Sequence, residues 1–264
     1  MSTRKAWSRA ELLVALNIYH KLRFGQFHRN NPVIIDLAKK LTRTPSSVSM
    51  KLCNFASLDP ALKMREIKGL QGASNRDREV WEEYHANIPE MAEKGEALLH
   101  TLFASDHASA IEIIPTKGIS PIKASPNLPT ESQAVQKRRL RQNYFREIVL
   151  NNFDGKCGIS GLPVRELLVA SHILPWATHP QERLSVDNGL CLSRLHDAAF
   201  DQGLISFDKS LCLQVSSHLK KFLPQAAIEQ NFSAYEGQKL CLPAEATTPN
   251  ETYLAHHRRN IFRK

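Results

Sequence analysis

The chain has 264 residues, of which 42% are hydrophobic and 23% are charged. This balance is typical of a globular protein and excludes a disordered, weakly hydrophobic chain. No apolar stretch approaches the roughly 18 residues that a membrane span needs, so no membrane partner is expected. The formal net charge of +9 favours a polyanionic partner, because binding to phosphates releases counterions. A solvated surface explains the charge equally well.

Helix start signals recur through the first hundred residues, which we therefore expect to be mostly helical. Each signal combines a capping side chain with an acid three residues later, or with a proline in the first turn. The four starts lie at Ser8 with Glu11, Asn31 with Pro32, Thr44 with Pro45, and Ser74 with Asp77. A three-residue turn at 42–44 separates the second helix from the third, and this pair predicts a helix-turn-helix.

The composition changes at residues 104–131, where Ser, Thr and Ala surround prolines at 115, 121, 126 and 129. Such a segment predicts a linker. A basic run without acids follows at the start of another helix; it contains Lys137, Arg138, Arg139, Arg141 and Arg146. From residue 157 onward, short strands alternate with turns, and one helix is expected at roughly 194–200. The predicted class is α+β, with a helical domain at 1–103, the linker at 104–131 and a second domain at 132–264.

The cysteines are odd in number and scattered, at Cys53, Cys157, Cys191, Cys212 and Cys241. This pattern fits reduced thiols better than a disulfide framework. The first residues lead directly into a patterned helix, and no signal peptide is recognised there. We therefore expect a cytoplasmic protein.

Two histidines and an asparagine follow one another in a pattern that can build a site. His172 ends a hydrophobic strand, and Pro175 stops that strand soon afterwards. An imidazole in this position can be held rigidly and still reach solvent. Asn188 lies in the next loop and His196 on the helix that follows. Strand, loop and helix can bring the two histidines to opposite sides of one cleft, with the asparagine bracing the loop.

The patterns SHI-x-PW, NGL-x-L and HD-x-AFD-x-GLI surround these residues. In this order they resemble the HNH nuclease family and its ββα-metal fold, particularly the branch at the C-terminus of bacterial restriction enzymes. The resemblance covers roughly residues 140–215 and continues weakly to Tyr253–Phe262. It implies that His172 is the general base, that Asn188 orients it, and that His196 is a ligand of one divalent cation. Asp197 and Asp201 are further candidate metal ligands. The expected cation is Mg²⁺, Mn²⁺ or Ni²⁺.

Two departures from the family pattern concern metal binding. Many HNH enzymes carry Asp or His immediately before the general base, whereas Ser171 stands there in this chain. Water or one of the aspartates can take the vacant ligand position. Several relatives also build a structural zinc site from paired CxxC motifs, but Cys157 begins only half of such a pair. We therefore predict no structural zinc.

The N-terminal half resembles the sensing domains of modification-dependent HNH restriction enzymes, among them the sulfur-binding domains of phosphorothioate-dependent enzymes. Segments 7–9, 24–25, 43–48, 54–60 and 69–70 carry the resemblance. The candidate DNA contacts are His28, Arg29, Ser46, Ser47, Lys51, Asn54 and Phe55, with Arg138, Arg139 and Arg141 of the basic run. A solvated helix face for Lys51 and a core position for Phe55 remain alternatives.

These resemblances predict a bacterial, type IV-like restriction endonuclease that hydrolyses phosphodiester bonds in double-stranded DNA. We expect phosphorothioate DNA to trigger it, and we expect it to act as a homodimer. One alternative is an HNH nuclease that senses methylated cytosine or no modification, or that serves another pathway or acts on RNA. The other alternative is a non-catalytic helix-turn-helix regulator.

Overall fold

A computed structural model describes residues 5–67, 70, 72–104, 108–123 and 133–264. The chain divides into two compact units, Met1–Glu147 (unit 1) and Ile148–Lys264 (unit 2). Helices and small two-stranded antiparallel sheets make up the described part, so the predicted mixture of helices and strands is confirmed. None of the described helices combines the length and the hydrophobicity that a bilayer span requires.

The helices of unit 1 begin where the sequence predicted. The Ser8 hydroxyl accepts a hydrogen bond from the Glu11 amide, and the Glu11 carboxylate accepts one from the Ser8 amide. Ser74 and Asp77 form the same reciprocal pair, whereas the side chains of Asn31 and Thr44 each accept a hydrogen bond from an amide of the first turn. The capped helices are α1 (Arg9–Lys21), α2 (Pro32–Lys40), α3 (Pro45–Ala56) and α5 (Asn75–Ala86). The short α4 (Pro60–Met64), the longer α6 (Ile88–Phe103) and the turn η1 (Phe24–Gln26) complete this helical part.

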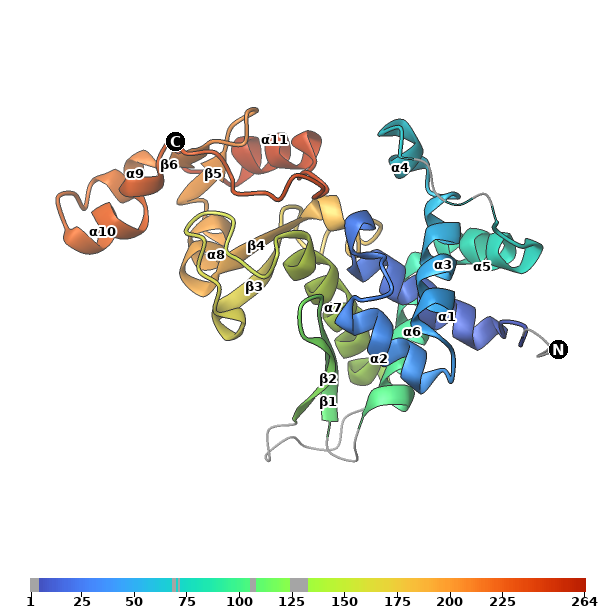
Figure 1. Cartoon of the computed structure of the whole chain (residues 1–264). Coiled ribbons are helices and arrows are strands. Elements are labelled where there is room, and N and C mark those ends of the chain that lie inside the picture. Colours follow the sequence, from blue (N-terminus) through green and yellow to red (C-terminus); the bar gives the residue numbers. More distant parts are fainter. Residues whose placement is uncertain (1–4, 68–69, 71, 105–107, 124–132) are drawn as a thin grey trace. The chain divides into compact units, whose positions relative to one another are not determined.

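The core of unit 1 surrounds α1, which packs against α3, α5 and α6 (Figure 1). Leu12, Leu16 and Ile18 are almost completely buried, and burial of each such side chain stabilises the fold by about 2 kcal/mol. The close crossing of α1 and α6 favours a glycine, because a Cβ at Gly95 would lie 2.6 Å from the Asn17 Nδ2 and 3.0 Å from the Asn17 Cβ.

A β-hairpin occupies part of the segment where the sequence predicted a linker. Strands β1 (Ala108–Ile114) and β2 (Gly118–Lys123) pair in antiparallel register, from Ile114 opposite Gly118 onward. Ile111 and Ile113 point to the same side of β1 and are buried. Pro121 lies in β2, where it is tolerated because both strands of a two-stranded sheet are edge strands. Residues 105–107 and 124–132 of the expected linker lie outside the described residues.

The next helix, α7 (Gln133–Asn152), begins in unit 1 and contributes its last residues to unit 2. The division of the chain after residue 147 therefore differs from the expected start of the second domain at residue 132. The reason lies in the helix, since its first part packs with unit 1: the Glu147 carboxylate accepts a hydrogen bond from the Ile113 amide at 2.7 Å.

In unit 2, two strands and a helix follow one another in the region of the sequence motifs. Strands β3 (Leu168–His172) and β4 (Gly189–Ser193) pair from Leu168 opposite Ser193 to His172 opposite Gly189. The predicted helix is present as α8 (Arg194–Asp201), and it packs on both strands. Short 3-10 turns precede the strands, η2 (Arg165–Leu167) before β3 and η3 (Val186–Asn188) before β4. This local arrangement places all the motif residues on one small scaffold.

The rest of unit 2 contains elements that the sequence analysis did not predict individually. A second hairpin, β5 (Ile205–Phe207) with β6 (Leu213–Val215), precedes the helical elements α9 (Ser217–Lys220), α10 (Ala226–Asn231), η4 (Ser233–Tyr235) and α11 (Glu251–Asn260). Helix α11 packs on β5 and fixes the end of α8, because the His257 ring stacks on Phe200 at 3.8 Å and donates to its carbonyl. These helices are short, and their positions depend on contacts between residues that are far apart in the sequence.

Candidate functional site

His172 is half-buried at the end of β3, and its ring has a defined orientation. The Nε2 atom lies 3.0 Å from the carbonyl oxygen of Arg183. Because a carbonyl oxygen can only accept, Nε2 carries the proton, and the lone pair of the neutral ring is on Nδ1. Burial lowers the pKa of His172, the hydrogen bond to Arg183 opposes this shift, and the Arg183 charge adds to it. The imidazole is therefore neutral at pH 7 and suited to accept a proton.

Asn188 is completely buried and holds the loop that follows His172. Its Oδ1 accepts a hydrogen bond from the Leu174 amide at 2.8 Å, and its Nδ2 donates to the Glu182 carbonyl at 3.1 Å. Its own carbonyl accepts from the Ile173 amide at 3.0 Å. One side chain thus fastens both ends of the 174–182 segment.

Asp197 and Asp201 lie one turn apart on α8 and carry like charges close to one another. Burial raises the pKa of Asp197, while the Ser171 hydroxyl beside it acts in the opposite direction. Burial and then the charge of Asp197 raise the pKa of Asp201 to about 6. Ser171 and His172 are successive residues of β3, so the imidazole and the carboxylates belong to adjoining elements.

His196 is buried, and its ring bonds to other parts of unit 2. Nε2 donates to the Asn231 carbonyl at 2.8 Å, while Nδ1 faces the Ser193 hydroxyl at 3.0 Å and the Cys157 sulfur at 3.5 Å. Burial opposes charge on this ring, but the bonds to Cys157 and Asn231 raise the pKa of His196. This arrangement differs from the expected metal ligand, because both ring nitrogens already face partners within the protein.

The groups around His196 also change the pKa of the Cys157 thiol. Burial opposes ionisation of Cys157, but hydrogen bonds from His196, from Ser160 and from nearby backbone amides lower its pKa to about 6. The thiol and the imidazole therefore stabilise one another's charged forms. Since Cys157, His196 and Asn231 are distant in the sequence, this cluster connects the start of the motif region to α8 and to the end of α10.

The aspartate pair fits a divalent cation in charge and in ligand type, because carboxylate oxygens are the ligands that Mg²⁺ and Mn²⁺ prefer. In the described part of the chain, no group of three or more His, Cys, Asp and Glu side chains is arranged to hold a metal ion. The structure thus brings Asp197 and Asp201 together, but not with His196. Mg²⁺ commonly keeps several water ligands and binds through one or two carboxylates with substrate phosphates, so two protein ligands are compatible with it.

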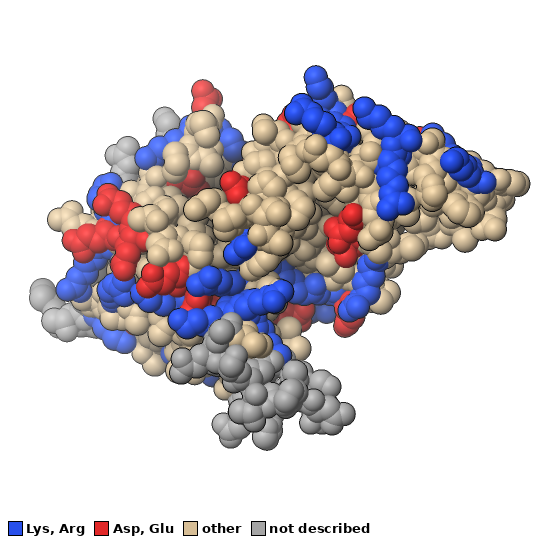
Figure 2. Space-filling model, turned by 180° about the vertical axis from the view of Figure 1, so that it is seen from behind, with Lys and Arg blue, Asp and Glu red and all other residues tan. Residues whose placement is uncertain are grey.

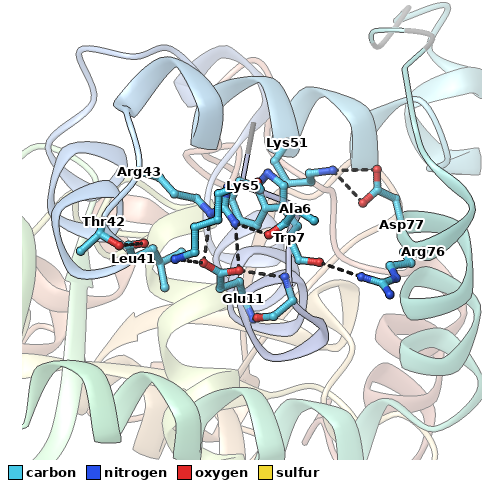
Figure 3. A network of polar contacts seen from close by, with 11 residues as sticks. Lys5, Ala6, Trp7, Glu11, Leu41, Thr42, Arg43, Lys51, Arg76 and Asp77 are labelled. Carbon is cyan, nitrogen blue, oxygen red and sulfur yellow. Dashed lines mark hydrogen bonds and ion pairs between the residues drawn. The ribbon is translucent and has the colours of Figure 1, made fainter. Parts of the chain in front are cut away.

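In unit 1, several predicted DNA contacts have structural partners instead. The Lys51 ammonium bonds both carboxylate oxygens of Asp77, at 2.7 and 2.8 Å (Figure 3). Phe55 is completely buried beside Tyr19 and Trp81, which is the alternative that the sequence left open for it. Asn54 is also buried. Among the predicted contacts at residues 28–55, His28, Arg29 and Ser46 reach solvent, and Ser47 is partly exposed.

The turn between α2 and α3 is fixed by Arg43. Its guanidinium bonds the Glu11 carboxylate and the carbonyls of Lys5 and Ala6, and it lies 4.1 Å from the centre of the Trp7 ring. Figure 3 shows these contacts next to the Lys51–Asp77 pair. The polar network therefore joins the residues before α1 to the start of α3.

The predicted basic run is only partly available for a partner. Arg141 forms an ion pair with Glu93 at 2.8 Å, and Lys137 lies 3.3 Å from the same carboxylate. Arg138 is exposed and Arg139 half-buried. Figure 2 shows lysine and arginine side chains interspersed with acidic ones over the face drawn. The positive charge on that face is therefore partly neutralised within the protein.

Residues 157–208 match a family model described as HNH endonuclease. The matched segment lies wholly in unit 2 and contains β3, β4, α8 and β5, with His172, Asn188, His196 and both aspartates. This match supports an HNH endonuclease domain in unit 2 and suggests that the protein is a nuclease. The prediction of an HNH domain in the C-terminal half is confirmed at this level. A comparison of the chain with curated proteins gave no match.

Sequence reasoning assigned no role to Trp176 and Arg183, which the structure places beside His172. Trp176 belongs to the SHI-x-PW pattern, so its position in the motif was a signal. Arg183 lies in a polar loop without a distinctive pattern, and only the folded loop brings its carbonyl to the imidazole.

Proposed function

We propose that the protein is a metal-dependent DNA endonuclease in which His172 is the general base. The supporting observation is the hydrogen bond from the His172 Nε2 to the Arg183 carbonyl within the segment that matches the HNH endonuclease family. In this tautomer Nδ1 removes a proton from water while the water oxygen attacks the phosphorus atom. The bond between phosphorus and the leaving oxygen of the DNA backbone then breaks.

Asp197 and Asp201 would hold the divalent cation in this proposal. A bound Mg²⁺ or Mn²⁺ supplies neutralisation of the phosphate charge and of the leaving oxygen. Burial raises the pKa of both aspartates, and the charge of Asp197 adds to the shift of Asp201; a bound cation would offset both effects. Ni²⁺ is less favoured, because it prefers imidazole ligands and the His196 ring is bonded to Asn231 and Ser193.

Unit 1 would locate modified DNA for the nuclease domain, and phosphorothioate DNA would be the trigger. The support is the resemblance of its sequence to sulfur-binding sensing domains, together with the exposure of His28, Arg29 and Ser46. With Lys51 and Phe55 in structural positions, the reading surface would consist of this exposed group and Ser47. A double-strand break would require two copies of the protein, acting in a bacterial cytoplasm.

Digestion of matched unmodified, phosphorothioated and 5-methylcytosine DNA, with Mg²⁺ or Mn²⁺, tests substrate and chemistry together. We expect cleavage of the phosphorothioated DNA only, and none after chelation of the metal. Cleavage of all three DNAs would remove the sensing role and leave the nuclease intact. DNA binding without cleavage of any of them would favour the non-catalytic regulator.

His172→Ala tests the mechanism in the same assay. General-base catalysis contributes about 10²- to 10⁴-fold, so we expect the cleavage rate to fall by that amount while DNA binding is retained. His218→Ala is the matched control, since His218 is an exposed histidine of α9 in the same unit. Equal rates for His172→Ala and the wild type would exclude His172 as the base.

A further inference from the structure

Trp176 and Arg183 form a closed set of contacts with His172. The Arg183 Nε donates to the Trp176 carbonyl at 2.6 Å, and the guanidinium carbon lies 5.2 Å from the centre of the Trp176 ring. The Trp176 ring in turn meets the His172 imidazole edge-on, with ring centres 5.3 Å apart and an angle of 81° between the planes. The Arg183 carbonyl accepts the His172 Nε2 hydrogen bond.

Arg183 thus acts on the imidazole in two ways, one direct and one through Trp176. Its backbone carbonyl fixes the proton on Nε2, and its side chain holds the indole that packs against the same imidazole. A shift of Arg183 would change both the ring orientation and the hydrogen bond that selects the tautomer. An exposed arginine that only bound phosphate would have no such connection to His172.

The hydrogen bonds of Asn188 hold the two ends of the loop and do not reach its middle, around Trp176. Asn188 bonds Leu174 and Glu182, whereas Pro175, Ala177 and the residues at 178, 180 and 181 are exposed. Between the two fastened ends, the Arg183 side chain is the group that bonds the Trp176 carbonyl and, more weakly, the Ala177 carbonyl at 3.5 Å.

We propose that Arg183 and Trp176 are positioning residues that hold His172 in its Nε2-protonated, reactive orientation. The proposal rests on the assignment of His172 as the general base and adds residues to that site. The guanidinium and the indole act through the loop and the imidazole, and they need no contact with DNA for this role.

Steady-state cleavage by Arg183→Met and Arg183→Lys is the first test. Misplacement of a catalytic group by about 1 Å can reduce the rate about 100-fold, so we expect kcat to fall by 10- to 100-fold in both variants. KM and the affinity for DNA are expected to stay close to the wild-type values. Lysine keeps the charge but lacks the Nε donor, so it does not restore kcat. The exposed Arg259 of α11 provides the matched control, Arg259→Met.

Trp176→Phe and Trp176→Ala separate positioning from folding. Phenylalanine keeps an aromatic ring against His172, so it retains more of kcat than alanine does.

A rise in KM with unchanged kcat in the Arg183 variants would show instead that Arg183 binds DNA, and would overturn the proposal. Unchanged kcat and KM would overturn it as well.

The tautomer of His172 gives a readout that does not need activity. Nitrogen-15 NMR of the histidine ring at pH 7 is expected to show protonated Nε2 in the wild type. A mixture of tautomers is expected in Arg183→Met, but not in Arg259→Met. The same pure tautomer in Arg183→Met would contradict the proposal. If the wild type cleaves no DNA, the nuclease assignment fails, while this measurement still decides whether Arg183 orients the ring.

Discussion

Two carboxylates of unit 1 and two of unit 2 have opposite surroundings. In unit 1, Glu11 faces Arg43 and Asp77 faces Lys51, so each negative charge has a cation within hydrogen-bond distance. In unit 2, Asp197 and Asp201 face one another. Burial alone would raise the pKa of Glu11, but hydrogen bonds from Arg43 and Ser8 lower it to about 2. The pKa of Asp201 is raised to about 6.

The difference separates carboxylates that are neutralised by cations of the protein from carboxylates that are not. A carboxylate paired within the protein contributes to the folded state and has no capacity left for a cation. A pair of neighbouring carboxylates costs stability until a cation binds. The ion-paired carboxylates of unit 1 therefore stabilise the fold, whereas the aspartates of unit 2 keep their capacity to bind a cation.

The largest expected effect is a loss of folding stability when the Lys51–Asp77 ion pair of unit 1 is broken. Asp77→Asn leaves the Lys51 ammonium in a position where its side chain is only 9% exposed, and breaking a buried pair costs about 3 to 5 kcal/mol. Urea unfolding followed by hydrogen exchange in α1 measures this loss. Glu79→Gln, an exposed change on the same helix, is the control. A loss as small as that of the control would mean that the pair is not structural.

A second prediction concerns acid stability of unit 1. Burial and the neighbouring His85 lower the pKa of His20 to about 3, whereas an unfolded histidine titrates near 6.5. Between these values the unfolded chain binds a proton that the folded chain does not, so stability falls as pH decreases from about 6.5. His20→Phe keeps the ring stacked on Tyr84 and removes this slope, which is about 1.4 kcal/mol per pH unit. Unfolding titrations at several pH values measure it.

His28→Gln is the control for His20→Phe, because the His28 side chain is exposed. Removal of an exposed histidine changes the pH slope little. Equal slopes for the wild type and His20→Phe would mean that His20 gains a proton in the folded protein, contrary to its burial.

The smallest expected change in stability comes from the pair of aspartates, Asp197 and Asp201. Asp201→Asn removes a like-charge pair one turn apart on α8, which stabilises the metal-free protein by about 0.5 kcal/mol. The same change weakens stabilisation by Mg²⁺, because one of the two carboxylates is lost. Thermal unfolding with and without Mg²⁺ measures both. Glu229→Gln in α10 is an exposed control; destabilisation of metal-free Asp201→Asn would contradict the expected repulsion.

Local signals in the sequence predicted the helix starts of unit 1, because a capping side chain and the amide that it bonds lie within three residues of each other. The hairpin at β1 and β2 was not predicted, since prolines dominate the composition there and strand pairing depends on more distant residues. We predicted Lys51 and Phe55 as DNA contacts, but both side chains are buried in unit 1. The periodicity of a helix does not show which of its faces other helices will cover.

The sequence by itself indicated an HNH domain, because the motifs around His172, Asn188 and His196 follow one another along the chain within the segment that matches the family model. Only the tertiary structure decided which groups those residues meet. His196 bonds Cys157 and Asn231, and His172 bonds the Arg183 carbonyl. These partners are main-chain atoms or residues far apart in the chain, and long-range packing alone brings them within hydrogen-bond distance.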